Sequence, residues 1–134
     1  MILGKTVGER KRSLAELVKN HLIGMGKAAE IIHGRVNSAG HKDQVLIDSE
    51  IGLIHLTSTS SDDPNSSLVT GGFKEKEQDY LADKKYVVFG WNAKGLKPRT
   101  FLFFVEAKEL VGRDGISKQE VNRLRDRQLS TVLA

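Results

Sequence analysis

The chain has 134 residues, contains no cysteine and carries a formal net charge of +4. The absence of cysteine excludes disulfides, thiolate zinc sites and thiol catalysis, and no apolar run approaches the roughly 18 residues of a membrane span. This length predicts a single domain over residues 1–134, and the positive charge favours a polyanionic partner. The start of the chain does not resemble a signal peptide, which predicts a cytoplasmic protein.

The first predicted element is a helix that begins near Thr6. Thr6 and Glu9 fit a capping box, in which a hydroxyl and a carboxylate each accept from an amide that the helix leaves unbonded. Apolar residues follow at helical spacing, and two glycines indicate the end of the helix. These residues are Leu14, Leu17, Val18 and Leu22, then Gly24 and Gly26.

Four cations surround the start of this predicted helix: Lys5, Arg10, Lys11 and Arg12. Cations at that end oppose the helix dipole, which favours anions there. A basic helix start that is rich in amides suits a phosphate. A solvated surface turn is the alternative interpretation.

The central predicted feature is a β-hairpin. Residues 27–36 are expected to run from a short helical piece into a strand. Residues 44–47 and 53–56 are apolar and β-branched runs, and the turn residues between them predict an antiparallel pair. In the second strand, alternation sends Ile54 and Leu56 to one face and His55 and Thr57 to the other. An acid at the mouth of the first strand, Asp43, can then converge with that polar pair.

The second half of the chain contains a polar loop and then further predicted elements. We expect a short helix within residues 73–85, strands at 86–91 and 100–105, and a helical turn at 106–110. The strand at 100–105 is apolar throughout, which indicates burial on both faces. Ser117 and Glu120 fit a second capping box that opens a last helix reaching Leu133. Its predicted polar face carries Lys118, Arg123, Arg125 and Arg127.

Taken together, these elements predict an α/β fold with a single mixed β-sheet of about five strands flanked by helices. Their order is helix, three strands, helix, two strands, helix. That order resembles the core of the PD-(D/E)XK superfamily, the restriction-endonuclease-like fold, and is most similar to archaeal Holliday-junction resolvases and Mrr-like enzymes. Three pieces carry the resemblance: Gly4 to Glu9, the loop at 37–43, and the strand at 53–58.

The resemblance implies a DNA partner, Mg²⁺ as cofactor and hydrolysis of a phosphodiester. Position by position, Asp43 matches the metal-binding acid of the family and Glu9 its helix-borne acid. His55 stands where the family has a second carboxylate, and as a neutral imidazole it could ligate a metal together with Asp43. Thr57 stands at the lysine position and cannot supply a positive charge beside the attacking water. Lys42 joins the four cations of the first helix as a predicted DNA contact.

A second register of the same motif competes with the first. Glu106-Ala-Lys108 is a literal Glu-x-Lys at the end of a predicted strand, and Asp83 precedes the strand before it. In this register Asp83 and Glu106 would bind Mg²⁺ and Lys108 would orient the nucleophile. An ordinary helix start at Glu106 is the structural alternative.

The alternative function is a catalytically inactive interaction or structural domain. Such a domain would form a homodimer through the apolar C-terminal strand or the last helix. The sequence leaves this alternative and the DNA-binding function both open.

Overall fold

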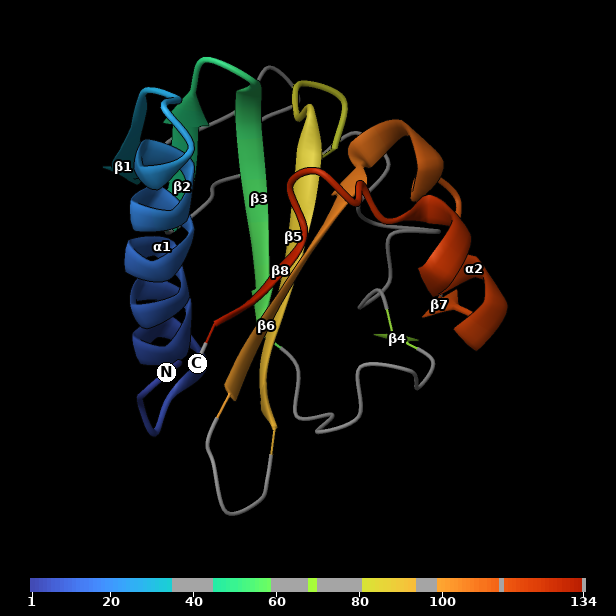
Figure 1. Ribbon diagram of the computed structural model, residues 1–134, viewed down its shortest axis with the longest axis horizontal. Helices are drawn as coiled ribbons and strands as arrows, with labels where there is room; N and C mark the ends of the chain where they lie inside the picture. Colours follow the sequence, from blue (N-terminus) through green and yellow to red (C-terminus); the bar gives the residue numbers. More distant parts are fainter. Residues whose placement is uncertain (35–44, 59–67, 70–80, 94–98, 114, 134) are drawn as a thin grey trace.

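The computed structural model describes residues 1–34, 45–58, 68–69, 81–93, 99–113 and 115–133. Its elements, labelled in Figure 1, are α1 (Val7–Gly24), β1 (Ala29–His33), β2 (Val45–Ser49), β3 (Gly52–Ser58), β4 (Leu68–Val69), β5 (Tyr86–Ala93), β6 (Arg99–Glu106), the 3-10 turn η1 (Ala107–Glu109), β7 (Gly115–Ile116), α2 (Lys118–Leu124) and β8 (Thr131–Leu133).

A six-stranded mixed sheet forms the centre of the fold, in the order β1-β2-β3-β5-β6-β8. β1, β2 and β3 are an antiparallel meander, and β3 runs parallel to β5. β5 and β6 form an antiparallel hairpin, and β8 pairs antiparallel with the outer edge of β6. The predicted α/β class with one mixed sheet is therefore confirmed, with six strands where about five were expected. A two-stranded ladder of β4 and β7 lies apart from this sheet.

The first helix begins and ends as its sequence predicts. The Thr6 hydroxyl accepts the Glu9 N–H at 3.1 Å, and the Glu9 carboxylate accepts the Lys5 N–H at 2.8 Å. The two side chains thus bond amides at the helix start that lack a backbone partner. At the other end Gly26 takes a φ of +79°, a conformation that glycine adopts without strain.

Side chains from the two faces of the sheet form two separate apolar clusters. α1 packs Leu14, Val18 and Leu22 onto the first face, against alternate residues of the strands such as Ile54 and Leu56. The second face is covered in part by α2 and the segment after β6, and its cluster includes the following residues: Val87, Phe89, Trp91, Phe103, Leu110 and Val121. β6 is buried on both faces from Thr100 to Val105, as its continuous apolar run predicts. In Figure 1, α1 and α2 lie at opposite sides of the sheet.

Three predicted elements differ from the structure. Within residues 27–36 the expected strand is confirmed, because residues 29–33 pair with β2 as strand β1, but the helical piece expected before it is wrong. The last helix ends at Leu124, not near Leu133, because residues 131–133 pair with β6 as β8. Of the helix expected at 73–85, residues 73–80 lie outside the described residues, and residues 81–85 form a turn and a bend.

None of the helices in the described part of the chain has the length and apolar character needed to cross a membrane.

Candidate functional site

The polar pair predicted on β3 lies on the face of the sheet opposite α1. His55 is only 6% exposed, and its neighbours across the strands are Leu46 on β2 and Val87 on β5. Thr57 is half-buried beside Phe89. The predicted alternation along β3 is confirmed, but the residues from Leu53 to Leu56 are all buried, so His55 lies between apolar neighbours.

The predicted site also needs two acids beside His55, Asp43 and Glu9. Asp43 and Lys42 lie outside the described residues. Glu9 lies in the first turn of α1, where one of its carboxylate oxygens already accepts the Lys5 N–H. Glu9 therefore has a structural role at the start of α1.

Mg²⁺ prefers several carboxylate and carbonyl oxygens around one point. Within the described ranges, no group of three or more His, Asp or Glu side chains is arranged to hold a metal ion. His55, buried between leucine and valine, does not fit the oxygen-rich donor set that this cation needs.

In the second register, each acid is beside a lysine. Asp83 accepts a hydrogen bond from Lys84 at 2.9 Å. Glu106 forms an ion pair with Lys108 at 3.1 Å, at the point where β6 passes into η1. The hydrogen bond and the charge of Glu106 raise the pKa of Lys108. Lys108 is thereby held as a cation that compensates Glu106, which is the geometry of a surface ion pair.

The cations at the start of α1 form the first basic surface, which we call the α1 cation cluster: Lys5, Arg10, Lys11 and Arg12. Lys5 and Arg12 are exposed, and Arg10 and Lys11 are half-buried. No carboxylate in the described part of the chain forms an ion pair with any of them. Their charge is therefore available to a partner.

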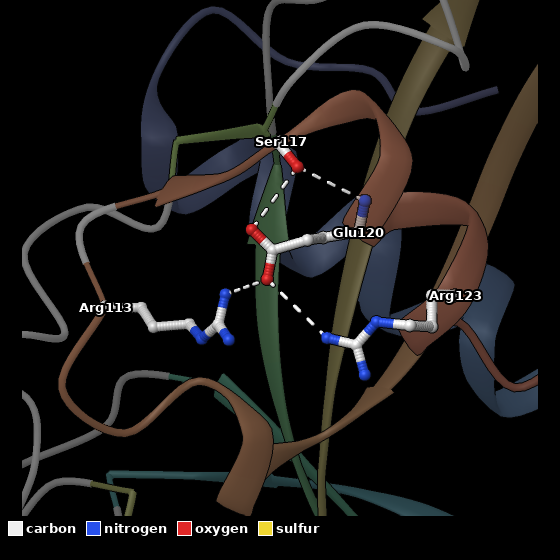
Figure 2. Close-up of polar contacts among 4 residues, drawn as sticks. All are labelled: Arg113, Ser117, Glu120 and Arg123. Carbon is white, nitrogen blue, oxygen red and sulfur yellow. Dashed lines mark hydrogen bonds and ion pairs between the residues drawn. The ribbon is translucent and has the colours of Figure 1, made fainter.

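A second group of cations, near α2, is neutralised within the protein. Figure 2 shows the Glu120 carboxylate between Arg113, which donates a hydrogen bond to it, and Arg123, whose guanidinium lies 3.7 Å away. The Ser117 hydroxyl accepts the Glu120 N–H at 3.3 Å, as the predicted second capping box requires. These contacts, led by the hydrogen bond from Arg113, lower the pKa of Glu120. Arg123 is therefore a poor candidate for binding an external anion.

Arg125 and Arg127 were expected on the last helix but lie beyond it. The chain leaves α2 at Arg125, which is extended, and then turns back through residues 126–130 into β8. Both arginines line a cavity of about 320 Å³, together with Phe103, Ser130, Thr131 and Val132. The sequence signal for this site is two arginines either side of one aspartate with a serine and a threonine close behind. Because the sequence predicts one helix from Ser117 to Leu133, it does not indicate that these side chains meet.

No protein-family model matches this chain, and no characterised protein and no solved structure matches it.

Proposed function

We propose that this protein binds DNA through the α1 cation cluster. The observation that carries the proposal is a set of four cations at one helix start with no carboxylate paired to them in the described residues. The helix has 18 residues, and the aligned peptide dipoles of such a helix place about half a positive elementary charge at its N-terminal end. Cations placed there oppose the dipole and lower the stability of the isolated protein. A phosphate backbone would relieve that repulsion and bond to the same groups.

The surface beside the cluster supports a polymer as the partner. A groove of about 390 Å³ runs between α1 and β1, and it is lined by Arg12, Ser13, Glu16, Ile31 and His33. Beside Arg12 the groove offers the His33 imidazole and the Ile31 side chain. The Ser13 hydroxyl already bonds to Leu3 and Met1, and Glu16 places one negative charge in the lining. Phosphate and sugar oxygens receive half to two-thirds of the hydrogen bonds in protein–DNA complexes, many of them from arginine and lysine.

A gel-shift series over salt concentration tests this proposal. For the unmodified protein, the logarithm of the binding constant should fall linearly with the logarithm of the salt concentration. Arg10→Gln should weaken binding and reduce that slope by about 0.9, the value for one lost phosphate contact on duplex DNA. Lys19→Gln, which removes the same charge about two and a half turns further along α1, is the matched control and should change the slope little.

Two outcomes would contradict the proposal. No binding at low salt would favour the alternative, an interaction domain that forms a homodimer, and sedimentation equilibrium would then measure the oligomeric state. Equal losses for Arg10→Gln and Lys19→Gln would mean that net charge, and not the α1 cation cluster, determines the affinity.

Cleavage of DNA is a separate prediction from binding. Thr57 has no amine to place beside a nucleophilic water, and this favours binding without hydrolysis. Incubating supercoiled plasmid with the protein and Mg²⁺ tests it, with EDTA and Asp43→Ala as the two controls. Nicking that requires both the cation and Asp43 would assign the nuclease activity. Nicking that is indifferent to both would come from another source. The cytoplasmic location stays a prediction.

A further inference from the structure

The cavity formed by β6, β8 and the connection between α2 and β8 combines charge, hydroxyl groups and an apolar wall. Its lining contains two guanidinium groups, two residues with hydroxyls, the Phe103 ring and Val132. Within the described residues, neither Arg125 nor Arg127 forms an ion pair with a carboxylate. The cavity therefore presents two positive charges that are not paired with a carboxylate of the described residues.

The one acid between the two arginines is committed elsewhere. One carboxylate oxygen of Asp126 accepts the N–H groups of Gln128 at 2.9 Å and Leu129 at 3.4 Å. Burial first, and then the charges of Asp126 and Glu106, raise the pKa of Tyr86, a residue that packs on the α1 face of the sheet. Asp126 thus stabilises the turn through these hydrogen bonds, and its charge affects Tyr86 on the α1 face of the sheet. Phe103, which lines the cavity, packs on the opposite face of the sheet.

Two of the polar groups are held in place before any ligand arrives. The Arg125 guanidinium carbon lies 4.8 Å from the centre of the Phe103 ring, and Phe103 is itself fixed edge-on against Trp91 at 4.8 Å. The Ser130 hydroxyl oxygen accepts the Phe104 N–H at 3.0 Å. That bond leaves the hydroxyl proton of Ser130 able to donate to a ligand. Preorganised donors lower the entropy cost of binding.

From this arrangement we propose that the cavity binds a phosphomonoester. A phosphomonoester carries nearly two negative charges at neutral pH and three terminal oxygens, which match two arginines and the hydroxyls beside them. A guanidinium binds such oxygens through two parallel hydrogen bonds. The cavity volume of about 320 Å³ lies within the range of ligand pockets, about 300–1,000 Å³. It can therefore hold a small organic group against Val132 as well as the phosphate. The site is independent of the α1 cation cluster, and the proposal does not rest on DNA binding.

Titration calorimetry at fixed ionic strength tests the proposal with adenosine monophosphate, adenosine and inorganic phosphate as probes. The monophosphate and inorganic phosphate should bind saturably, and adenosine should not. Arg127→Gln should weaken binding of the monophosphate about tenfold or more, because a charged hydrogen bond is lost. Arg127→Lys keeps the charge but loses the planar fork, so it should bind with intermediate affinity. Arg123→Gln, whose guanidinium faces Glu120, is the matched control.

The source of the phosphomonoester is decided by a second pair of probes. An oligonucleotide with a 5′-phosphate and the same oligonucleotide with a 5′-hydroxyl are compared with the mononucleotide. Tighter binding of the phosphorylated oligonucleotide than of both others would identify the end of a nucleic acid, and tightest binding of the mononucleotide would identify a free metabolite. Equal binding of adenosine and its monophosphate would overturn the site. Unchanged affinity in both Arg127 variants would overturn it as well, and circular dichroism confirms that each variant is folded.

Discussion

Gly90 determines how closely α1 approaches the sheet. It lies in β5 on the face that α1 covers, and a Cβ placed on it would press against Leu14 Cδ1 and lie 3.0 Å from Ile2 Cδ1. Leu14 is fully buried, so a shift of its side chain would disturb the packing of the core around it. The absence of a side chain at this one position allows the helix to pack here.

We therefore expect Gly90→Ala to destabilise the protein by about 1–3 kcal/mol, the typical cost of overpacking a filled core. Urea unfolding followed by circular dichroism measures the change. Gly24→Ala is the control, since a Cβ at Gly24 meets nothing within 4 Å. A Gly90→Ala variant as stable as the unmodified protein would contradict the packing of α1 described here.

Glu120 makes the stability of the fold sensitive to acid. Its pKa is lower in the folded protein than its usual value of 4.5, chiefly because Arg113 donates a hydrogen bond to the carboxylate. A group with a lowered folded pKa contributes stability above its unfolded pKa, and that contribution is lost as the pH falls through the folded pKa.

Glu120→Gln should accordingly lower the melting temperature at neutral pH. The difference from the unmodified protein should shrink as the pH falls below about 4.5, where Glu120 of the unfolded chain takes up a proton, and should vanish below the lower pKa of the folded protein. Thermal melts between neutral pH and strongly acidic pH give both curves. A difference that stays constant over this range would show that the ion pair with Arg113 does not contribute.

At the scale of elements, the C-terminal segment shows where periodicity misleads. Val121, Leu124, Leu129, Val132 and Leu133 are compatible with one helix. The helix nevertheless ends at Leu124, because the Asp126 N–H bonds to Phe104 and not to its own helix. The partner that ends the helix is a backbone carbonyl on β6. A long-range contact of this kind leaves no trace in local spacing.

The two apolar residues Leu129 and Val132 distinguish the observed segment from a continuous helix. On a helix they would share a face at i, i+3 spacing. In the structure Leu129 is 4% exposed in the α1-side core, and Val132 is 47% exposed. Leu129→Ala should cost about 2–5 kcal/mol of stability, and Val132→Ala should cost within about 0.5 kcal/mol. Equal losses in urea unfolding would favour the helix.

Local signals were sufficient for the elements that contact their sequence neighbours. The β2–β3 hairpin, β5, β6 and both capping boxes follow from residue type and spacing, and all are present. The parallel pairing of β3 with β5 and the position of β8 join segments far apart in the chain. The candidate site depended on such placement, and so His55 could be assigned to a face of the sheet but not to its buried surroundings.

On the scale of the whole molecule, the α1 cation cluster and Arg125 lie near opposite ends of the central strands. The start of the chain is tied to β5 near its end, where Asn92 accepts the Ile2 N–H at 2.9 Å. Arg125 pairs with Val105, which lies across from Val87 near the start of β5. Five residues of strand separate these two levels, which is roughly 17 Å at the usual rise. Figure 1 shows the N-terminus and the α2–β8 connection correspondingly far apart.

Sites separated by that distance, with no shared partner, are expected to act additively. Arg10→Gln should therefore reduce DNA affinity and leave binding of adenosine monophosphate unchanged. Arg127→Gln should weaken binding of adenosine monophosphate and leave the affinity for a duplex without terminal phosphates unchanged. In the double variant each loss should equal that of its single variant to within about 0.5 kcal/mol. If Arg127→Gln weakens duplex binding as much as Arg10→Gln does, the two surfaces belong to one continuous DNA interface, because a duplex long enough to span both would contact them together.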